Sequence, residues 1–212
     1  MKNNLAHMKK FLAIFSVLAL LPTATFAEVV DAFPDVDQTH TYYDAIEYVR
    51  TTGLVNGNSV DGTFAPDNTL NRAEMLKILV LAAGASESEI LNYESEECFT
   101  DVPAQEWFTG YVCYGKDKGY VKGYGDNSFK PSQAVTFVEG MKIAYEAFGL
   151  EWTENSDPDP WYKDVVEKAS LAKYIPPSID DFNKDLLRAE MADMAARIHP
   201  EASSETGLKE YL

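Results

Sequence analysis

Two arginines at predicted helix starts are the side chains best suited to bind a charged ligand. Arg72 and Arg188 each precede Ala-Glu at the beginning of an apolar segment. The helix macrodipole disfavours a positive charge in the first turn, so capping does not explain these arginines. A guanidinium beside the free amides of a helix start can hold a carboxylate through paired hydrogen bonds. The alternative is an internal ion pair with Asp35, Asp101 or another acidic residue at a repeat junction.

Two tryptophans have the chemistry of a sugar-binding site. Trp107 and Trp161 stand at the start of predicted helices, and each is followed by another aromatic residue. Aromatic faces near polar donors can stack on the apolar face of a sugar ring. The alternative is that both side chains are core residues that close one end of a packed unit.

Residues that could catalyse a reaction or bind a metal do not form a recognisable pattern. His40 and His199 are isolated, and close pairs of acidic residues carry little information in so acidic a chain. The segment Asp181-Phe-Asn-Lys-Asp185 begins like a calcium loop but lacks Gly at its sixth position and Glu at its twelfth. We therefore expect no enzyme activity, no catalytic residues, no metal and no cofactor.

Cys98 and Cys113 are the only cysteines in the chain. In an exported protein such a pair predicts a disulfide. Closing a loop of about 15 residues stabilises a protein by roughly 3 kcal/mol in the chain-entropy model. The alternative is two free buried thiols.

The elements that position these residues are repeated along the chain. Phe33-Pro-Asp-Val36 returns as Phe99-Thr-Asp-Val102, and a third, eroded copy is anchored on Trp161-Tyr162 and Arg188-Ala-Glu190. Fixed-period similarity indicates stacked units that cannot bury their apolar faces alone. Further matched pairs in the first two copies are Gly53 and Gly119, Gly57 and Gly123, Phe64 and Phe129, Pro66 and Pro131, and Glu74 and Glu139.

The residue pattern within each unit predicts a helix, a loop and a second helix. Apolar residues recur at helical spacing from Ala45 to Val49, and Gly53 is placed to end that helix. The second helix begins at Asn71-Arg-Ala-Glu74 or Thr136-Phe-Val-Glu139, both of which match the capping box. The segment from Met75 to Ala83 is apolar on nearly every face, which places it in the middle of a bundle.

The N-terminal segment predicts export. Three lysines precede an uncharged apolar run from Phe11 to Leu21, and small residues follow up to Ala27. This pattern is typical of a signal peptide over residues 1–27, and the run is too short to cross a bilayer of about 30 Å. We expect no membrane span after its removal.

The charge balance limits the classes of partner. The chain has 18 Lys and Arg against 34 Asp and Glu, a formal net charge of −16. Such a chain repels phosphate backbones and anionic lipid surfaces, so we expect no binding to nucleic acid. The simplest interpretation of the charge is a solubilising surface.

The motif order resembles the S-layer homology repeat. In this order Phe-x-Asp-Val is followed by an aromatic, two glycines, Phe-x-Pro and Arg-Ala-Glu. The resemblance implies a mainly α fold in which three helix-loop-helix repeats share one core as a pseudo-threefold spindle, with very short β pairings in the loops. The implied divisions are repeats at 31–84, 99–149 and 161–200, the third degenerate, an acidic linker at 85–98, a linker at 150–160 and a polar tail at 201–212.

The same resemblance implies a non-catalytic, exported protein of the cell wall or surface that binds cell-wall polysaccharide, often pyruvylated, or peptidoglycan. Phe137 breaks the arginine motif in the second copy, and the third lacks Phe-x-Asp-Val. The alternative is a structural S-layer or envelope protein that has lost glycan binding and assembles with other surface-layer proteins. The implied glycan-binding residues are Arg72, Arg188, Asp35, Asp101, Trp107, Trp161, Gly57 and Gly123.

Overall fold

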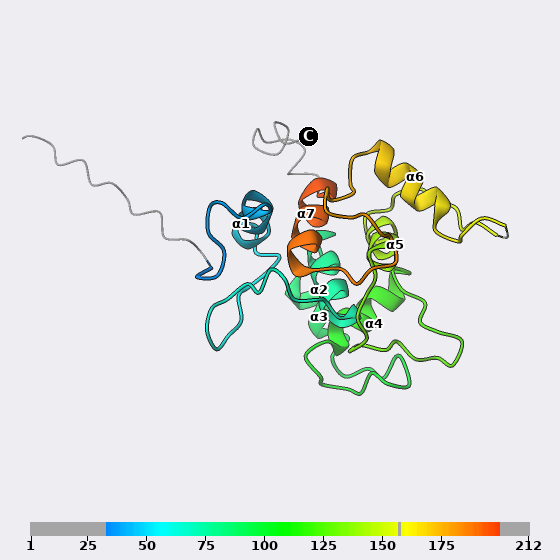
Figure 1. The fold of residues 1–212 in the computed structure, drawn as a ribbon. Helices are drawn as coiled ribbons and strands as arrows, with labels where there is room; N and C mark the ends of the chain where they lie inside the picture. The colour runs from blue at the N-terminus through cyan, green and yellow to red at the C-terminus, as the bar shows by residue number, and fades with distance from the viewer. Residues whose placement is uncertain (1–32, 157, 200–212) are drawn as a thin grey trace, which may run out of the picture. The chain divides into compact units, whose positions relative to one another are not determined.

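The computed structural model describes residues 33–199 except residue 157 (Figure 1). The predicted signal peptide and polar tail lie outside the described residues. The predicted mainly α fold of helix-loop-helix repeats is confirmed. The helices in the described part of the chain are α1 (Tyr43–Thr51), α2 (Arg72–Ala82), α3 (Glu87–Leu91), α4 (Thr109–Asp117), α5 (Phe137–Ala147), α6 (Lys163–Leu171) and α7 (Arg188–Ile198).

Among the described helices, α2, α5 and α7 contain the most buried residues. α2 packs against α4, α5 and α7, as its apolar character predicts (Figure 1). Met75, Met141 and Met191, one on each of these helices, are completely buried. Burying a side chain of this size contributes about 1.5–3 kcal/mol, so the core is shared by all three copies.

The first helix of each copy packs against the second helix of a different copy. α4 of the second copy contacts α2 of the first, and α6 contacts α5 of the second copy. The circle is closed by α1, which contacts α7 near the end of the described chain (Figure 1). The two helices of one sequence repeat therefore belong to different packed pairs.

Three backbone hydrogen bonds form a closed ring at the centre. The amide of Leu70 donates to the carbonyl of Leu186 (3.0 Å), Leu186 donates to Val135 (2.9 Å), and Val135 donates to Leu70 (3.0 Å). All three side chains are fully buried. The predicted short β pairings flank this ring as isolated bridges, at Thr69 with Leu187, Asn71 with Ala134, and Thr136 with Asp185.

The predicted capping boxes are present at two of the three inner helices. Asn71 accepts a hydrogen bond from the Glu74 amide (2.9 Å), and Glu74 accepts one from the Asn71 amide (3.0 Å). Thr136 and Glu139 make the same exchange. These bonds satisfy helix-start amides that would otherwise lack partners.

The acidic segment 85–98 contains a short helix. α3 begins after Ser86, and its Ile90 is buried against α4. Gly110 of α4 allows this contact, because a Cβ atom there would lie 2.7 Å from Ile90. The segment is therefore packed against the second copy at one face.

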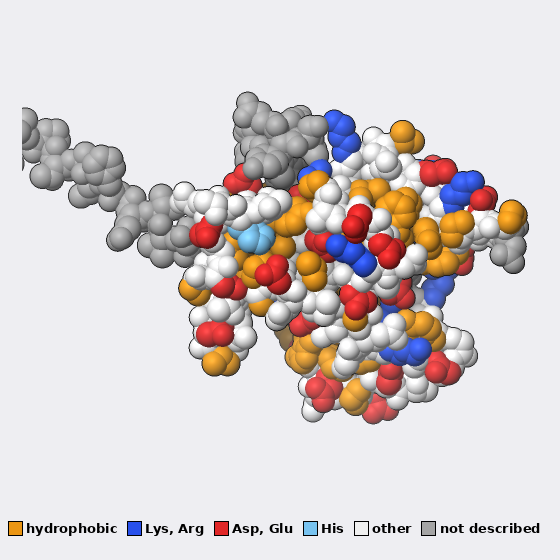
Figure 2. Space-filling model, in the orientation of Figure 1, with side chains coloured by type: hydrophobic (Ala, Val, Ile, Leu, Met, Phe, Trp, Pro, Cys, Tyr) orange, Lys and Arg blue, Asp and Glu red, His pale blue; other side chains and the backbone are white. Residues whose placement is uncertain are grey.

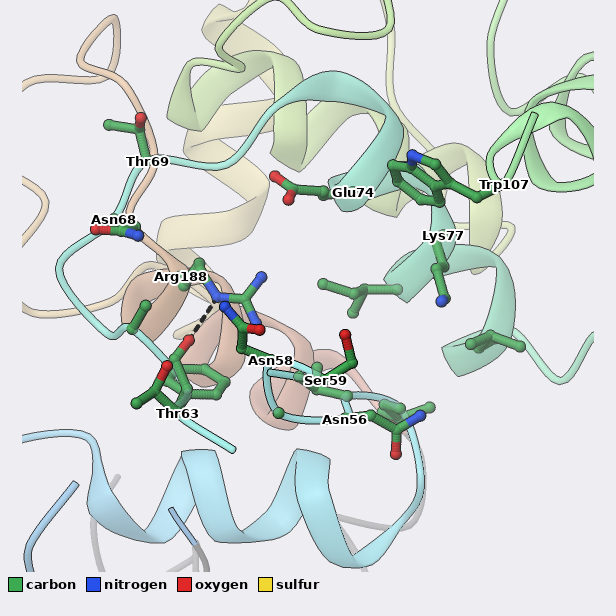
Figure 3. Close-up of a pocket in the computed structure, with 17 residues that line it drawn as sticks. Asn56, Asn58, Ser59, Thr63, Asn68, Thr69, Glu74, Lys77, Trp107 and Arg188 are labelled. Carbon is green, nitrogen blue, oxygen red and sulfur yellow. Dashed lines mark hydrogen bonds between the residues drawn. The ribbon is translucent and has the colours of Figure 1, made fainter. Parts of the chain in front are cut away.

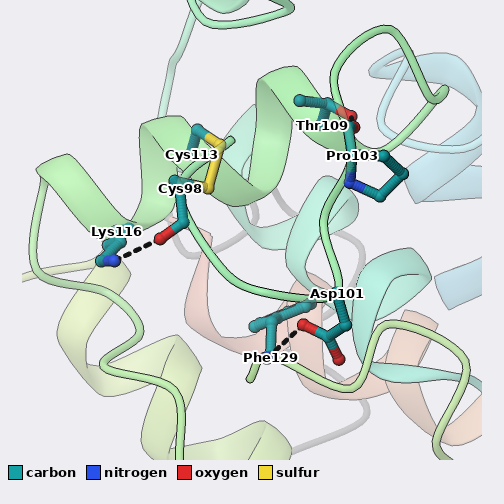
Figure 4. Close-up of a disulfide and its surroundings, with 7 residues drawn as sticks. All are labelled: Cys98, Asp101, Pro103, Thr109, Cys113, Lys116 and Phe129. Carbon is teal, nitrogen blue, oxygen red and sulfur yellow. Dashed lines mark hydrogen bonds between the residues drawn. A yellow bond between two sulfur atoms is a disulfide. The ribbon is translucent and has the colours of Figure 1, made fainter. Parts of the chain in front are cut away.

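The predicted disulfide between Cys98 and Cys113 is confirmed (Figure 4). It joins the residue before Phe99 to α4. Lys116, one turn further along α4, donates a hydrogen bond to the Cys98 carbonyl. Among the described residues, no helix has the length and hydropathy needed to cross a membrane.

Gly123 has no room for a side chain. Its φ of +72° lies in the left-handed region, and a Cβ atom would lie 2.4 Å from the Phe99 ring and 2.7 Å from the Ser128 carbonyl oxygen. Gly57 holds the same place in the first copy, where a Cβ would lie 2.7 Å from the Gly62 carbonyl oxygen. Both glycines let the Phe-x-Asp-Val phenylalanine pack under the loop.

We predict that Gly123→Ala lowers the free energy of unfolding by about 1–3 kcal/mol, because strain and overlap act together. Urea unfolding followed by circular dichroism measures this change. Gly125→Ala is the matched control, since no atom lies within 4 Å of a Cβ there. Equal stability of the two variants would contradict the packing described for Gly123.

Candidate functional site

Asp35 and Asp101 hold the loops of their own repeats. The carboxylate of Asp35 accepts hydrogen bonds from the amides of Phe64 (2.8 Å) and Ala65 (2.7 Å). The second copy repeats the arrangement, in which Asp101 accepts from the amides of Phe129 and Lys130, both at 2.7 Å (Figure 4). The oxygens of both aspartates are thus committed to loop amides.

The two arginines hold the same loops from another repeat. Nε of Arg188, in the third copy, donates to the Phe64 carbonyl of the first copy (2.7 Å, Figure 3). Nε of Arg72, in the first copy, donates to the Phe129 carbonyl of the second (2.9 Å). Each guanidinium carbon lies 5.0 Å from the centre of that phenylalanine ring. Neither arginine pairs with Asp35 or Asp101 in the described structure, but Arg72 forms the expected kind of internal ion pair with another acidic residue, Glu139 (3.9 Å).

Three copies contribute to one cavity, which we call groove 1. It has a volume of about 470 Å³. The first copy supplies the loop from Leu54 to Ser59 and one side of α2, the second supplies Trp107, and the third supplies Arg188 (Figure 3). Trp107 is 52% exposed, which argues against its being a core residue.

Lys77 is a groove residue that the sequence reasoning missed. It extends from α2 into groove 1, and its Nζ lies 5.8 Å from the centre of the Trp107 ring and 5.2 Å from that of Tyr111 (Figure 3). The signal for it is the spacing Glu-x-x-Lys, which occurs at Glu74 and again at Glu139. Lys142 is its equivalent in the second copy.

A second cavity, which we call groove 2, repeats the plan one copy further on. Its volume is about 230 Å³, and it is lined by Gly123, Lys142, Trp161 and Arg72. Nζ of Lys142 lies 5.2 Å from the ring centres of both Trp152 and Trp161. Groove 2 is therefore smaller, and its lysine lies beside two indole rings whose centres are 6.5 Å apart.

The two arginines differ in how much of each is available to a ligand. Arg72 is 7% exposed, and its Nη1 lies 3.9 Å from the Glu139 carboxylate. Arg188 forms no ion pair with a described residue within 4.0 Å, and Figure 3 shows its guanidinium at the cavity wall. Burial lowers the pKa of Arg188, while Glu74 and Asp35 act in the opposite direction.

The place on α7 that is equivalent to grooves 1 and 2, which we call the third position, is occupied by internal contacts. Asp193 stands where Lys77 and Lys142 stand, and its carboxylate accepts a hydrogen bond from Arg197 (2.6 Å). Burial raises the pKa of Asp193, and the Arg197 pairing lowers it. A cavity beside Asp193, lined in part by Thr41 and Asp44, has a volume of about 50 Å³.

The residues that would form a groove at the third position are replaced, and the three replacements lie in three different segments of the chain. Thr41 replaces the tryptophan, Phe137 replaces the arginine, and Asp193 replaces the lysine. Ser178 adds to the closure, since its hydroxyl accepts from Tyr42 (2.7 Å) and donates to Glu190 (2.6 Å). The structure thus brings together the predicted residues of groove 1 and groove 2 but no third set.

Grooves 1 and 2 each present a lysine, an arginine and a tryptophan. A lysine ammonium and a guanidinium donate to a carboxylate, and an exposed indole stacks on a sugar face. In the described part of the chain, no three His, Cys, Asp or Glu side chains form a group able to hold a metal ion.

Comparisons with known proteins find two of the repeats. Residues 32–76 and 99–137 match the family model of the S-layer homology domain. The chain is 30% identical over 191 residues to a surface layer protein of Brevibacillus choshinensis, covering 88% of this chain and 16% of that protein. It is 28% identical over 188 residues to the S-layer protein sap of Bacillus anthracis, covering 82% and 22%.

A third relative is the cellulosome-anchoring protein of Acetivibrio thermocellus, which is 27% identical over 169 residues, covering 73% of this chain and 35% of that protein. The chain spans only 16% of the length of the Brevibacillus choshinensis protein and 17% of that of a middle cell wall protein of Brevibacillus brevis, to which it is 31% identical over 182 residues, 79% of this chain.

We predict that Arg72→Ala lowers the free energy of unfolding by about 1–3 kcal/mol, because the Phe129 carbonyl loses its buried donor. Chemical denaturation measures the change. Lys122→Ala is the control, since this exposed lysine lines the same groove, and it should alter stability by no more than about 0.5 kcal/mol. A fully stable Arg72→Ala protein would contradict the loop-holding role.

Proposed function

We propose, on the premise that this chain is an S-layer homology domain protein, that it anchors at the cell surface by binding an acidic cell-wall polysaccharide in grooves 1 and 2. One observation carries the proposal. Lys77, Trp107 and Arg188 come from three copies and line the same open cavity, and groove 2 has equivalent residues. In this proposal the protein is exported, non-catalytic and located at the cell wall or surface.

Each groove residue has a distinct role in the proposal. The ammonium of Lys77 and the outer nitrogens of Arg188 bind the carboxylate of the sugar, such as that of a pyruvate ketal. The indole of Trp107 stacks on the sugar ring. Gly57 and Asp35 act indirectly, because they fix the loop whose backbone forms the opposite wall.

The acidic charge of the whole chain does not prevent this binding. On the face shown in Figure 2, acidic side chains are interspersed with lysines and arginines. At physiological ionic strength the screening length is about 8 Å, so distant carboxylates contribute little at a groove. Among the described residues that line groove 1, Glu74 is the acidic one, against the two cations Lys77 and Arg188.

We infer further that residues 161–200 form a third, degenerate repeat whose role is structural. α6 and α7 take the packed positions that complete the cycle of helix pairs. Their own groove position is filled by the Asp193 and Glu190 contacts. The repeat then closes the ring and lends Trp161 and Arg188 to the two open grooves.

A second candidate function is assembly with other surface-layer proteins without glycan binding. It is favoured by the names of two relatives, a surface layer protein and an S-layer protein. Light scattering separates the candidates, because assembly predicts oligomers in the absence of any glycan, whereas anchoring predicts binding that depends on the grooves. Peptidoglycan is the alternative ligand, and purified wall with its secondary polymer removed distinguishes the two.

We predict that Lys77→Gln weakens co-sedimentation of the mature protein with purified cell walls about tenfold, because one charge-assisted hydrogen bond to the ligand is lost. Lys142→Gln should have a smaller effect, because groove 2 is smaller and the Lys142 ammonium already lies 5.2 Å from the centres of two indole rings. The measurement is the bound fraction across a series of wall concentrations.

Lys118→Gln is the matched control for that experiment, because it removes the same charge from an exposed position outside both grooves. Walls stripped of ketal-linked acids by mild acid should retain less protein. If the Lys77 and Lys118 variants bind walls equally well, the proposed use of groove 1 is wrong.

A further inference from the structure

A second hollow adjoins groove 1 on the far side of Trp107. Its volume is about 290 Å³, and Lys77 and Trp107 line both cavities. The two hollows therefore meet at this pair of side chains. A ligand longer than one sugar can lie across the indole and occupy both.

This hollow is built by the acidic segment that the proposed function leaves unexplained. α3 supplies Glu87 and Leu91, and α4 supplies Gly110 and Tyr111. The close approach of α3 requires Gly110, because a Cβ atom there would collide with Ile90 at 2.7 Å.

The hollow is much larger beside groove 1 than at the equivalent place lined by Thr41, Asp44 and Asp193, where the cavity is about 50 Å³. The helices equivalent to α4 carry Asp44 and Asp164 at the position of Gly110. The corresponding linker, 150–160, forms no helix in its described residues. The hollow is thus enlarged beside groove 1, where α3 forms one of its walls.

The charge of the hollow is opposite to that of groove 1. Glu87 and Glu94 both line it, and their carboxylates have no hydrogen bond or ion pair with any described residue. Burial raises the pKa of Tyr111, and the negative charges of Glu87 and Glu94 raise it further. Two unpaired carboxylates and a neutral phenol therefore stand beside an exposed indole.

We propose that this hollow is a subsite for a protonated amino sugar that neighbours the acidic sugar in the same polysaccharide. The proposal rests on the proposed function of groove 1 and names its ligand class more narrowly, as a glycan that carries both charges. The ammonium of the amino sugar pairs with Glu87 and Glu94, and the ring packs against Trp107. Two carboxylates outnumber the single Lys77 ammonium there, which favours a cationic ligand.

The test uses a matched pair of probes, the tetramer of glucosamine and the tetramer of N-acetylglucosamine. They differ only in whether the amines are free. Calorimetric titration at pH 6 and about 0.15 M salt, where surface charges are screened, should show about tenfold tighter binding of the free-amine tetramer, as one charged hydrogen bond provides. Equal binding of the two tetramers would overturn the proposal.

The paired variants are Glu87→Gln with Glu94→Gln, and Glu96→Gln with Glu97→Gln. Both remove two negative charges from the same exposed segment, but only the first pair lines the hollow. We expect the first pair to abolish the preference for the free-amine tetramer and the second pair to keep it. If both double variants lose the preference, the net charge of the segment explains it, and the subsite proposal is wrong.

Failure of the subsite and failure of the proposed function give different results on cell walls. If Lys77→Gln weakens wall binding and Glu87→Gln with Glu94→Gln leaves it unchanged, the proposed use of groove 1 is supported and the subsite proposal is wrong. If neither variant alters wall binding, the proposed function itself falls. Weaker wall binding by both supports a ligand that spans the two cavities.

Discussion

The fold depends on the closed ring of backbone hydrogen bonds among Leu70, Val135 and Leu186. Buried amides and carbonyls need partners, and here each partner comes from a different copy. The bonds around the ring extend the same rule, since the Arg72 amide donates to the Gln133 carbonyl and the Arg188 amide to the Asn68 carbonyl. No copy can satisfy its own central backbone, so the three segments fold as one unit.

The ring also explains why each groove is a composite. It fixes the start of every inner helix against the loop of the next copy, and so Arg188 reaches the Phe64 carbonyl while Trp107 stands across α2. A substitution in one copy therefore changes a groove that another copy mostly forms. Three such substitutions, Thr41, Phe137 and Asp193, fall on the same third position and leave the other two grooves complete.

The sequence predicted the local structure well because local rules decide it. The capping box at Asn71 and the disulfide of Cys98 depend on residues close in the chain. The sequence could not show that Arg188 of the third copy lies in the same groove as Trp107 of the second. The spacing of residues along the chain does not reveal which copies pack side by side. Lys77 was missed for a related reason, since a lysine on a helix is usually solvent-exposed until a neighbouring copy supplies the aromatic ring.

The two arginines combine structural and proposed binding roles in a way that accounts for the uneven grooves. Nε of Arg188 holds a loop carbonyl, and its outer nitrogens remain directed to the cavity, so one side chain serves both roles. Phe137, at the equivalent position in the second copy, can serve only the structural role. Its ring, fully buried, packs 6.0 Å from the ring of Phe182, so an apolar contact takes over the stabilising role without any charge. The fold tolerates this replacement because the ring of backbone hydrogen bonds needs only a side chain that packs at the helix start. Binding an acidic ligand, in contrast, needs a positive charge.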